Sequence, residues 1–141
     1  MATYAPTHHR LLSRAQTDRF ISALDHARTA QDVEKAVEQA INNLLVTGLQ
    51  AAHPTSTIIH DYRHSTDGYI TVGSSPSLAQ PYALLVEAKR DLDFSGSRRD
   101  VATVLTQVCH YLRAIGRAGD RVPTVTVVCD TDEVFAIPTT L

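Results

Sequence analysis

The segment that most constrains the fold is a continuous apolar run at residues 82–86, Tyr-Ala-Leu-Leu-Val. A half-exposed strand alternates apolar and polar side chains, so an unbroken run of this length is typical of a strand buried on both faces. Such a strand needs a packed layer on each side of its sheet. The run therefore favours an α/β protein with helices covering both faces.

Three amphipathic segments supply the helices. Thr17 is the expected N-cap of a short first helix, and the second helix is predicted over about residues 32–47, with Gly48 ending it. Ser97 is the expected N-cap of the third helix, which follows a hydrophilic loop. Each segment repeats its apolar residues at helical spacing.

Strands fill the rest of the pattern and give the order α-α-β-β-β-α-β-β. The helix between the third and fourth strands predicts a right-handed crossover that joins parallel neighbours. We therefore expect an α/β sandwich with a mixed central sheet flanked by helices. The predicted strands are residues 56–63, 67–73, 82–86, 122–129 and 133–137.

The chain of 141 residues is short enough for a single core. Residues 1–16 show no clear period and are expected to form a flexible arm, which leaves 17–141 as one domain. Because the sequence stops just after a strand, we expect this domain to be the N-terminal part of a longer protein.

Charged residues follow the apolar run at once, as Glu87-Ala88-Lys89. Side chains alternate along a strand, so Glu87 and Lys89 share one face and Ala88 packs on the other. Buried charge is costly unless it is paired or binds a metal. Lysine is also scarce, since only Lys35 and Lys89 occur among 13 basic residues. The position of Lys89 therefore indicates a site.

A second carboxylate precedes the neighbouring strand, at Asp67. If the strands on either side of the intervening loop pair, Asp67 lies near Glu87. Two converging carboxylates are the hard oxygen ligands that Mg²⁺ prefers. Asp67 is also a plausible turn residue before Gly68, and Asp61 is the rival carboxylate on the preceding strand.

Two polar side chains of the third helix, Gln107 and Tyr111, are spaced i and i+4 and share one face. That face borders the apolar stripe, so it is directed toward the sheet. Packing at the sheet edge is the alternative role for both.

The combination Asp67, nineteen intervening residues, Glu87-Ala88-Lys89 and a helix with Gln-x-x-x-Tyr resembles the PD-(D/E)XK nuclease superfamily. The similarity covers about residues 32–137 and is strongest to the N-terminal nuclease domains of type I and fused restriction-modification proteins. Thr66 stands where the family name has proline. The resemblance implies a restriction-endonuclease-like α/β sandwich.

The resemblance also implies a role for each motif residue. Asp67 and Glu87 would hold Mg²⁺ or Mn²⁺ with the Ala88 carbonyl, and Lys89 would be the catalytic lysine. Gln107 and Tyr111 would support the site or touch DNA. A glutamate of the preceding helix often completes such a site, and Glu34 and Glu38 both qualify. Glu34 lies nearer the centre of the apolar stripe and is the first choice.

Basic charge is concentrated beyond the motif. Residues 89–121 contain seven basic and four acidic side chains, although the whole chain has a net charge of −2. Arg90, Arg98 and Arg99 are the candidate contacts to DNA phosphates, and solvation of the loop is the alternative.

We therefore expect a Mg²⁺-dependent DNA endonuclease domain of a restriction-modification or related defence system. The alternative is a catalytically idle nuclease-like module used for DNA binding or assembly. Expected partners are DNA and a methyltransferase or helicase domain or subunit, with a homodimer left open. Two cysteines form no disulfide framework, and no signal peptide or membrane-spanning run is present, which predicts a cytoplasmic protein.

Overall fold

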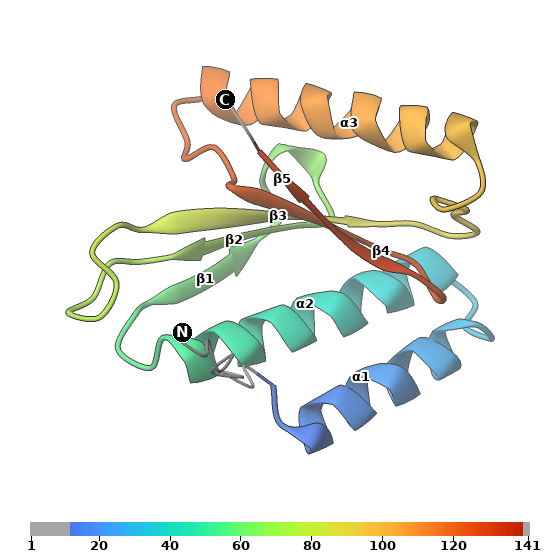
Figure 1. Ribbon diagram of the computed structural model, residues 1–141, viewed down its shortest axis with the longest axis horizontal. Helices are drawn as coiled ribbons and strands as arrows, with labels where there is room; N and C mark the ends of the chain where they lie inside the picture. Colours follow the sequence, from blue (N-terminus) through green and yellow to red (C-terminus); the bar gives the residue numbers. More distant parts are fainter. Residues whose placement is uncertain (1–11, 140–141) are drawn as a thin grey trace, which may run out of the picture.

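The computed structural model describes residues 12–139 as a five-stranded sheet between two layers of helices (Figure 1). Helices α1 (Arg14–Ala27) and α2 (Val33–Ala52) lie on one face of the sheet, and α3 (Arg98–Arg117) lies on the other. The predicted α/β class with helices on both faces is confirmed. In the described part of the chain, no helix is both long and apolar enough to cross a membrane.

The sheet is mixed and its strands follow the order β1-β2-β3-β4-β5. Every neighbouring pair is antiparallel except β3 and β4, which are parallel and joined through α3. The predicted order of elements and the parallel crossover are therefore confirmed. The strands are β1 (Ile58–Asp61), β2 (Gly68–Val72), β3 (Tyr82–Ala88), β4 (Val125–Cys129) and β5 (Val134–Pro138).

The central strand β3 is buried on both faces, as its composition predicts. Leu84, Val86 and Ala88 pack into the core formed with α1 and α2. Ala83 and Leu85 belong to the opposite core, which is closed by α3. Glu87 therefore points to the α3 side of the sheet and is only 3% exposed.

Two helix boundaries differ from the prediction. Helix α1 begins at Arg14 behind the N-cap Ser13, whose side chain forms a reciprocal capping box with Gln16, so Thr17 is not the N-cap and the predicted arm 1–16 is too long. Residues 1–11 of that arm lie outside the described residues. Helix α2 passes through Gly48 to Ala52. Leu49 packs against the core, and this burial outweighs the roughly 1 kcal/mol cost of a helical glycine.

The connection between β1 and β2 is held against the end of α3. A 3₁₀ turn, η1 (Arg63–Ser65), carries His64 and Ser65 in the left-handed region, at φ 61° and 59°. The Arg63 guanidinium and the His64 imidazole Nε2 both contact the Asp120 carboxylate at 2.9 Å. These contacts fix the backbone just before Asp67.

Candidate functional site

Asp67 lies directly across from Glu87 at the end of the β2–β3 ladder. The antiparallel register pairs Gly68 with Val86, so the next step of the ladder places Asp67 opposite Glu87. The backbone N–H of Ala88 donates a hydrogen bond to Asp67 Oδ2 at 2.7 Å. The predicted approach of Asp67 to the Glu-Ala-Lys segment is therefore present in the structure.

Lys89 folds back on Glu87. Its Nζ lies 2.9 Å from Glu87 Oε1, and its own N–H donates to the Cys129 carbonyl at 2.8 Å. The second carboxylate oxygen, Glu87 Oε2, is buried and has no hydrogen-bond partner among the described residues. A buried carboxylate oxygen without a partner is costly, and a bound cation is one way to satisfy it.

We call the end of β2 and β3 that carries Asp67 and Glu87 the carboxylate edge. The negative charges gathered there disfavour one another's ionised forms. Burial raises the pKa of Asp67, and the charges of Glu38 and Glu34 add to the increase against the opposing hydrogen bond from Ala88. Burial also raises the pKa of Glu87, with Lys89 opposing the shift and Asp67 adding to it. The site therefore has more negative charge than its own residues neutralise.

Lys89 stays cationic in this setting. Burial acts to lower the pKa of Lys89, but the hydrogen bond and charge of Glu87 outweigh it, with the charges of Glu34 and Asp67 acting in the same direction. The net pKa lies above the ordinary lysine value. The ammonium is thus a fixed positive charge and hydrogen-bond donor at neutral pH.

Helix α3 brings Gln107 and Tyr111 toward the same edge. Burial raises the pKa of the Tyr111 hydroxyl, and the charges of Glu87 and Asp67 raise it further. Gln107 Oε1 is buried without a hydrogen-bond partner among residues 12–139. Tyr111 is therefore close enough to the carboxylates to feel their charge, and Gln107, one turn earlier on α3, is partly buried.

The two candidate glutamates of α2, Glu34 and Glu38, differ in burial, and the charges of both raise the pKa of Asp67. Glu38 is 6% exposed, whereas Glu34 is exposed in the first turn of α2. The Glu38 Oε1 atom lies 3.1 Å from Lys35 Nζ, which in turn lies 5.1 Å from the centre of the Tyr62 ring. Glu38 thus faces inward beside a cation of its own, whereas the charge of Glu34 also raises the pKa values of Glu87 and Lys89, so the choice of Glu34 stays a prediction.

Asn42 contributes to the site, although the sequence analysis did not single it out. Its Nδ2 donates to the Asp67 carbonyl at 3.0 Å. A Cβ added to Gly68 would stand 2.4 Å from Asn42 Oδ1, so any larger residue at this step of β2 would displace the Asn42 side chain. The spacing of Glu38 and Asn42, i and i+4 on α2, is the signal that identifies them as one row.

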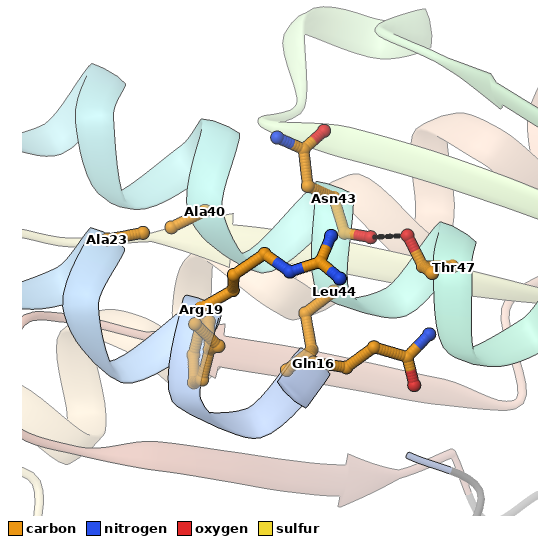
Figure 2. Close-up of a pocket in the computed structure, with 8 residues that line it drawn as sticks. Gln16, Arg19, Ala23, Ala40, Asn43, Leu44 and Thr47 are labelled. Atoms are coloured by element: carbon orange, nitrogen blue, oxygen red, sulfur yellow. Dashed lines mark hydrogen bonds between the residues drawn. The ribbon is translucent and has the colours of Figure 1, made fainter. Parts of the chain in front are cut away.

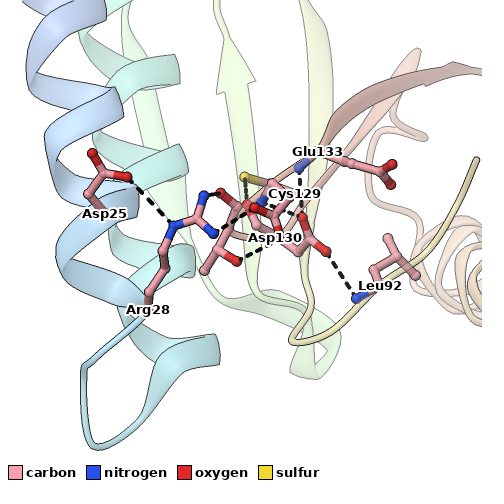
Figure 3. Close-up of polar contacts among 8 residues, drawn as sticks. Asp25, Arg28, Leu92, Cys129, Asp130 and Glu133 are labelled. Atoms are coloured by element: carbon pink, nitrogen blue, oxygen red, sulfur yellow. Dashed lines mark hydrogen bonds and ion pairs between the residues drawn. The ribbon is translucent and has the colours of Figure 1, made fainter.

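The loop after Lys89 is fastened to the end of β4 (Figure 3). The buried Asp130 carboxylate accepts hydrogen bonds from the N–H groups of Leu92, Asp132 and Glu133 at 3.0, 2.8 and 2.7 Å. Glu133 in turn accepts from the Phe94 N–H at 3.2 Å. These bonds hold the chain where it leaves β3, and so position Lys89.

The three predicted phosphate contacts are exposed but not gathered at one point. Arg90 follows Lys89 directly and pairs with Asp91 at 3.4 Å. Arg98 and Gln107 are nine residues apart on α3, which places them on opposite sides of the helix. The structure therefore does not bring Arg98 to the carboxylate edge, and Arg99 lies on the outer face of α3.

Asp61, the rival to Asp67, belongs to another cluster. Its Oδ2 pairs with Arg63 Nε at 2.9 Å, and its Oδ1 accepts the Arg63 N–H at 3.0 Å. Neither contact involves Glu87 or Lys89. The geometry thus selects Asp67 as the partner of Glu87.

Asp67 and Glu87 are the residues at this edge that could hold a Mg²⁺ ion with few protein ligands. Within residues 12–139, no group of three or more His, Cys, Asp or Glu side chains is arranged to hold a metal. Mg²⁺ is usually bound through one or two carboxylates together with waters and substrate phosphate. The unpartnered Glu87 Oε2 and the adjacent Asp67 carboxylate supply such a pair.

A separate hollow lies between α1 and α2 (Figure 2) and has a volume of about 420 Å³. Arg19 is the single charged side chain in its lining, which includes Phe20, Ala23 and Leu44. None of the candidate site residues borders it. The hollow is therefore distinct from the carboxylate edge.

A comparison with models of protein families finds no match, and searches of curated proteins and of solved structures also return no similar chain.

Proposed function

We propose that this chain is a Mg²⁺-dependent DNA endonuclease domain with a restriction-endonuclease-like fold. The observation that carries the proposal is the meeting of Asp67, Glu87 and Lys89 at one end of β2 and β3, with Glu87 Oε2 left without a partner. Carboxylates, a cation and an unsatisfied buried oxygen in one place are typical of a metal-assisted phosphoryl site.

Asp67 and Glu87 would hold the metal, with the Ala88 carbonyl as a further oxygen donor. In an antiparallel pair the N–H and C=O of one residue point to the same side. The Ala88 N–H is directed at Asp67, so its carbonyl faces the same side. A bound Mg²⁺ would polarise the scissile phosphate and bring a water molecule to it.

Lys89 and Tyr111 would act on the phosphate side of the reaction. The pKa values of both groups are raised, so both carry their protons at neutral pH. They would therefore donate to phosphate oxygens or orient the attacking water. Hydrolysis joins the water oxygen to phosphorus and breaks the bond to one sugar oxygen, which receives a proton.

Cleavage of supercoiled plasmid DNA tests the proposal. We expect the full chain to nick or linearise the plasmid with Mg²⁺ or Mn²⁺ and to be inactive with EDTA. Lys89→Ala removes the cation beside the phosphate and should slow cleavage at least about a hundredfold. Lys89→Arg, which keeps a positive charge, should retain part of the activity.

An idle nuclease-like module for DNA binding or assembly is the second candidate. It is favoured by one observation, namely that Lys35 and Lys89 already pair with Glu38 and Glu87 and so partly neutralise the carboxylates that would hold a metal. Equal inertness of wild type and Lys89→Ala, in a chain that still binds DNA, would select this second function.

A further inference from the structure

One face of α3 carries a regular row of exposed basic and small polar side chains. The spacing alternates between four and three residues, which keeps the row on one side of the helix over about five turns. Every member is exposed. The row consists of Arg99, Thr103, Thr106, His110, Arg113 and Arg117.

The charge of this row is of one sign. Helix α3 contains a single acidic residue, Asp100, whose Oδ2 accepts the Asp93 N–H at 2.9 Å. None of the arginines of the row forms an ion pair with another residue in the described range 12–139. By contrast, Arg14 and Asp18 of α1 form an i,i+4 ion pair, as is common on a solvated helix face.

Nothing in the described part of the chain covers this face. Helix α3 is alone on its side of the sheet, while α1 and α2 lie on the other side (Figure 1). The row borders the candidate site, because Thr103 and Gln107 are i and i+4 neighbours. From Arg99 to Arg117 the helix extends about 27 Å, which is about the axial length of eight base-pair steps of a DNA duplex.

We propose that the outer face of α3 is a docking surface for the DNA phosphate backbone, an inference that rests on the proposed nuclease function. Arginine and histidine donate to phosphate oxygens, and the threonines between them leave room for the backbone to approach. The row contains no asparagine or glutamine, the side chains that read adenine. Its regularly spaced cations match a repeating phosphate backbone, and the contact lays a duplex beside the Asp67–Glu87 edge.

Salt-dependent DNA binding tests this surface without any cleavage. The affinity of the full chain for a 30-base-pair duplex is measured by fluorescence anisotropy in EDTA at several NaCl concentrations. The variant Arg113→Gln/Arg117→Gln should bind roughly tenfold more weakly at low salt. Its slope of log affinity against log salt should be smaller by up to about 1.8, since each phosphate contact contributes about 0.9.

Matched controls separate a local effect from a change in net charge. Arg14→Gln/Arg19→Gln removes the same charge from α1, on the far side of the sheet, and should leave the slope unchanged. Arg113→Lys/Arg117→Lys keeps the point charges and should restore the slope.

Equal losses in the α1 and α3 pairs, an unchanged α3 pair, or no wild-type binding at 50 mM salt would each overturn the inference. Plasmid cleavage by wild type and by Lys89→Ala is measured in a separate experiment, which tests the nuclease function alone. An inactive but DNA-binding chain would therefore refute the nuclease and leave the docking surface standing.

Discussion

The Asp67 carboxylate is held in place at a cost to stability. It accepts the Ala88 N–H and lies beside Glu87, Glu38 and Glu34, while Lys89 is already paired with Glu87. A raised pKa means that the folded state binds a proton more tightly than the unfolded chain does. The free energy of unfolding therefore falls as pH rises from the ordinary aspartate pKa of about 3.9 through the raised value.

Asp67→Asn should relieve this cost. The asparagine Oδ1 can still accept the Ala88 N–H, but the negative charge is gone. We expect the variant to be more stable than wild type by about 1 kcal/mol at pH 7, and the gain to vanish as pH falls below about 3. Thermal unfolding across this pH range measures the difference.

Magnesium provides the control for that experiment. Millimolar Mg²⁺ should raise the Tm of wild type, because a ligand that binds the folded state stabilises it. It should leave the Tm of Asp67→Asn unchanged. An Asp67→Asn variant that is less stable than wild type at pH 7 would show that the carboxylate has a purely structural role.

Alternation along β3 was sufficient to predict that Glu87 and Lys89 share a face, but position around α2 was not sufficient to predict which of its two glutamates is buried. Glu34 is closer to the apolar stripe in angle. Glu38, one turn further along, lies between Glu34 and Asn42 in the same row of α2 and is the buried one of the two glutamates. Which turn of a helix is buried depends on tertiary packing, whereas sequence periodicity indicates only which side of the helix is buried.

At the scale of elements, helix ends with a strong local sequence signal were predicted correctly, and helix ends with a weak signal were not. Ser97 caps α3 as expected, with its side chain accepting the Asp100 N–H. The cap of α1 was misplaced because Arg14 and Ala15 are exposed and carry no apolar period. The end of α2 was misplaced because packing of Leu49 overrides the helix-breaking tendency of Gly48.

The contact between α2 and β2 depends on Gly68. Gly68→Ala would drive a methyl group into Asn42 Oδ1, so we expect a loss of about 1–3 kcal/mol in the free energy of unfolding, measured by urea denaturation. Gly73→Ala is the matched control at the other end of β2, where the nearest atom would be at an ordinary 3.5 Å.

A double-mutant cycle assigns the effect to this contact. In an Asn42→Ala background the added methyl group no longer contacts a side-chain amide. Gly68→Ala should therefore lower the free energy of unfolding much less in that background than in wild type. The same cost in both backgrounds would mean that Asn42 is not the obstacle.

At the scale of the whole molecule, distant segments meet at one end of the sheet. The α2 row, the start of β2, the end of β3 and the inner flank of α3 converge on Asp67 and Glu87. The Arg63–Asp120 and His64–Asp120 contacts close the connection behind Asp67, and Asp130 closes the loop after Lys89. The layered order of elements followed from the sequence, whereas these long-range polar contacts did not, because they join residues far apart in the chain.

The most direct test of the account compares two aspartates in the plasmid-cleavage assay with Mg²⁺. Asp67→Asn removes the carboxylate opposite Glu87, and Asp61→Asn removes an equal charge from the Arg63 cluster. We expect Asp67→Asn to reduce cleavage at least about a hundredfold and Asp61→Asn to keep most of the wild-type rate. Cleavage that survives Asp67→Asn and is lost with Asp61→Asn would contradict the assignment of the site.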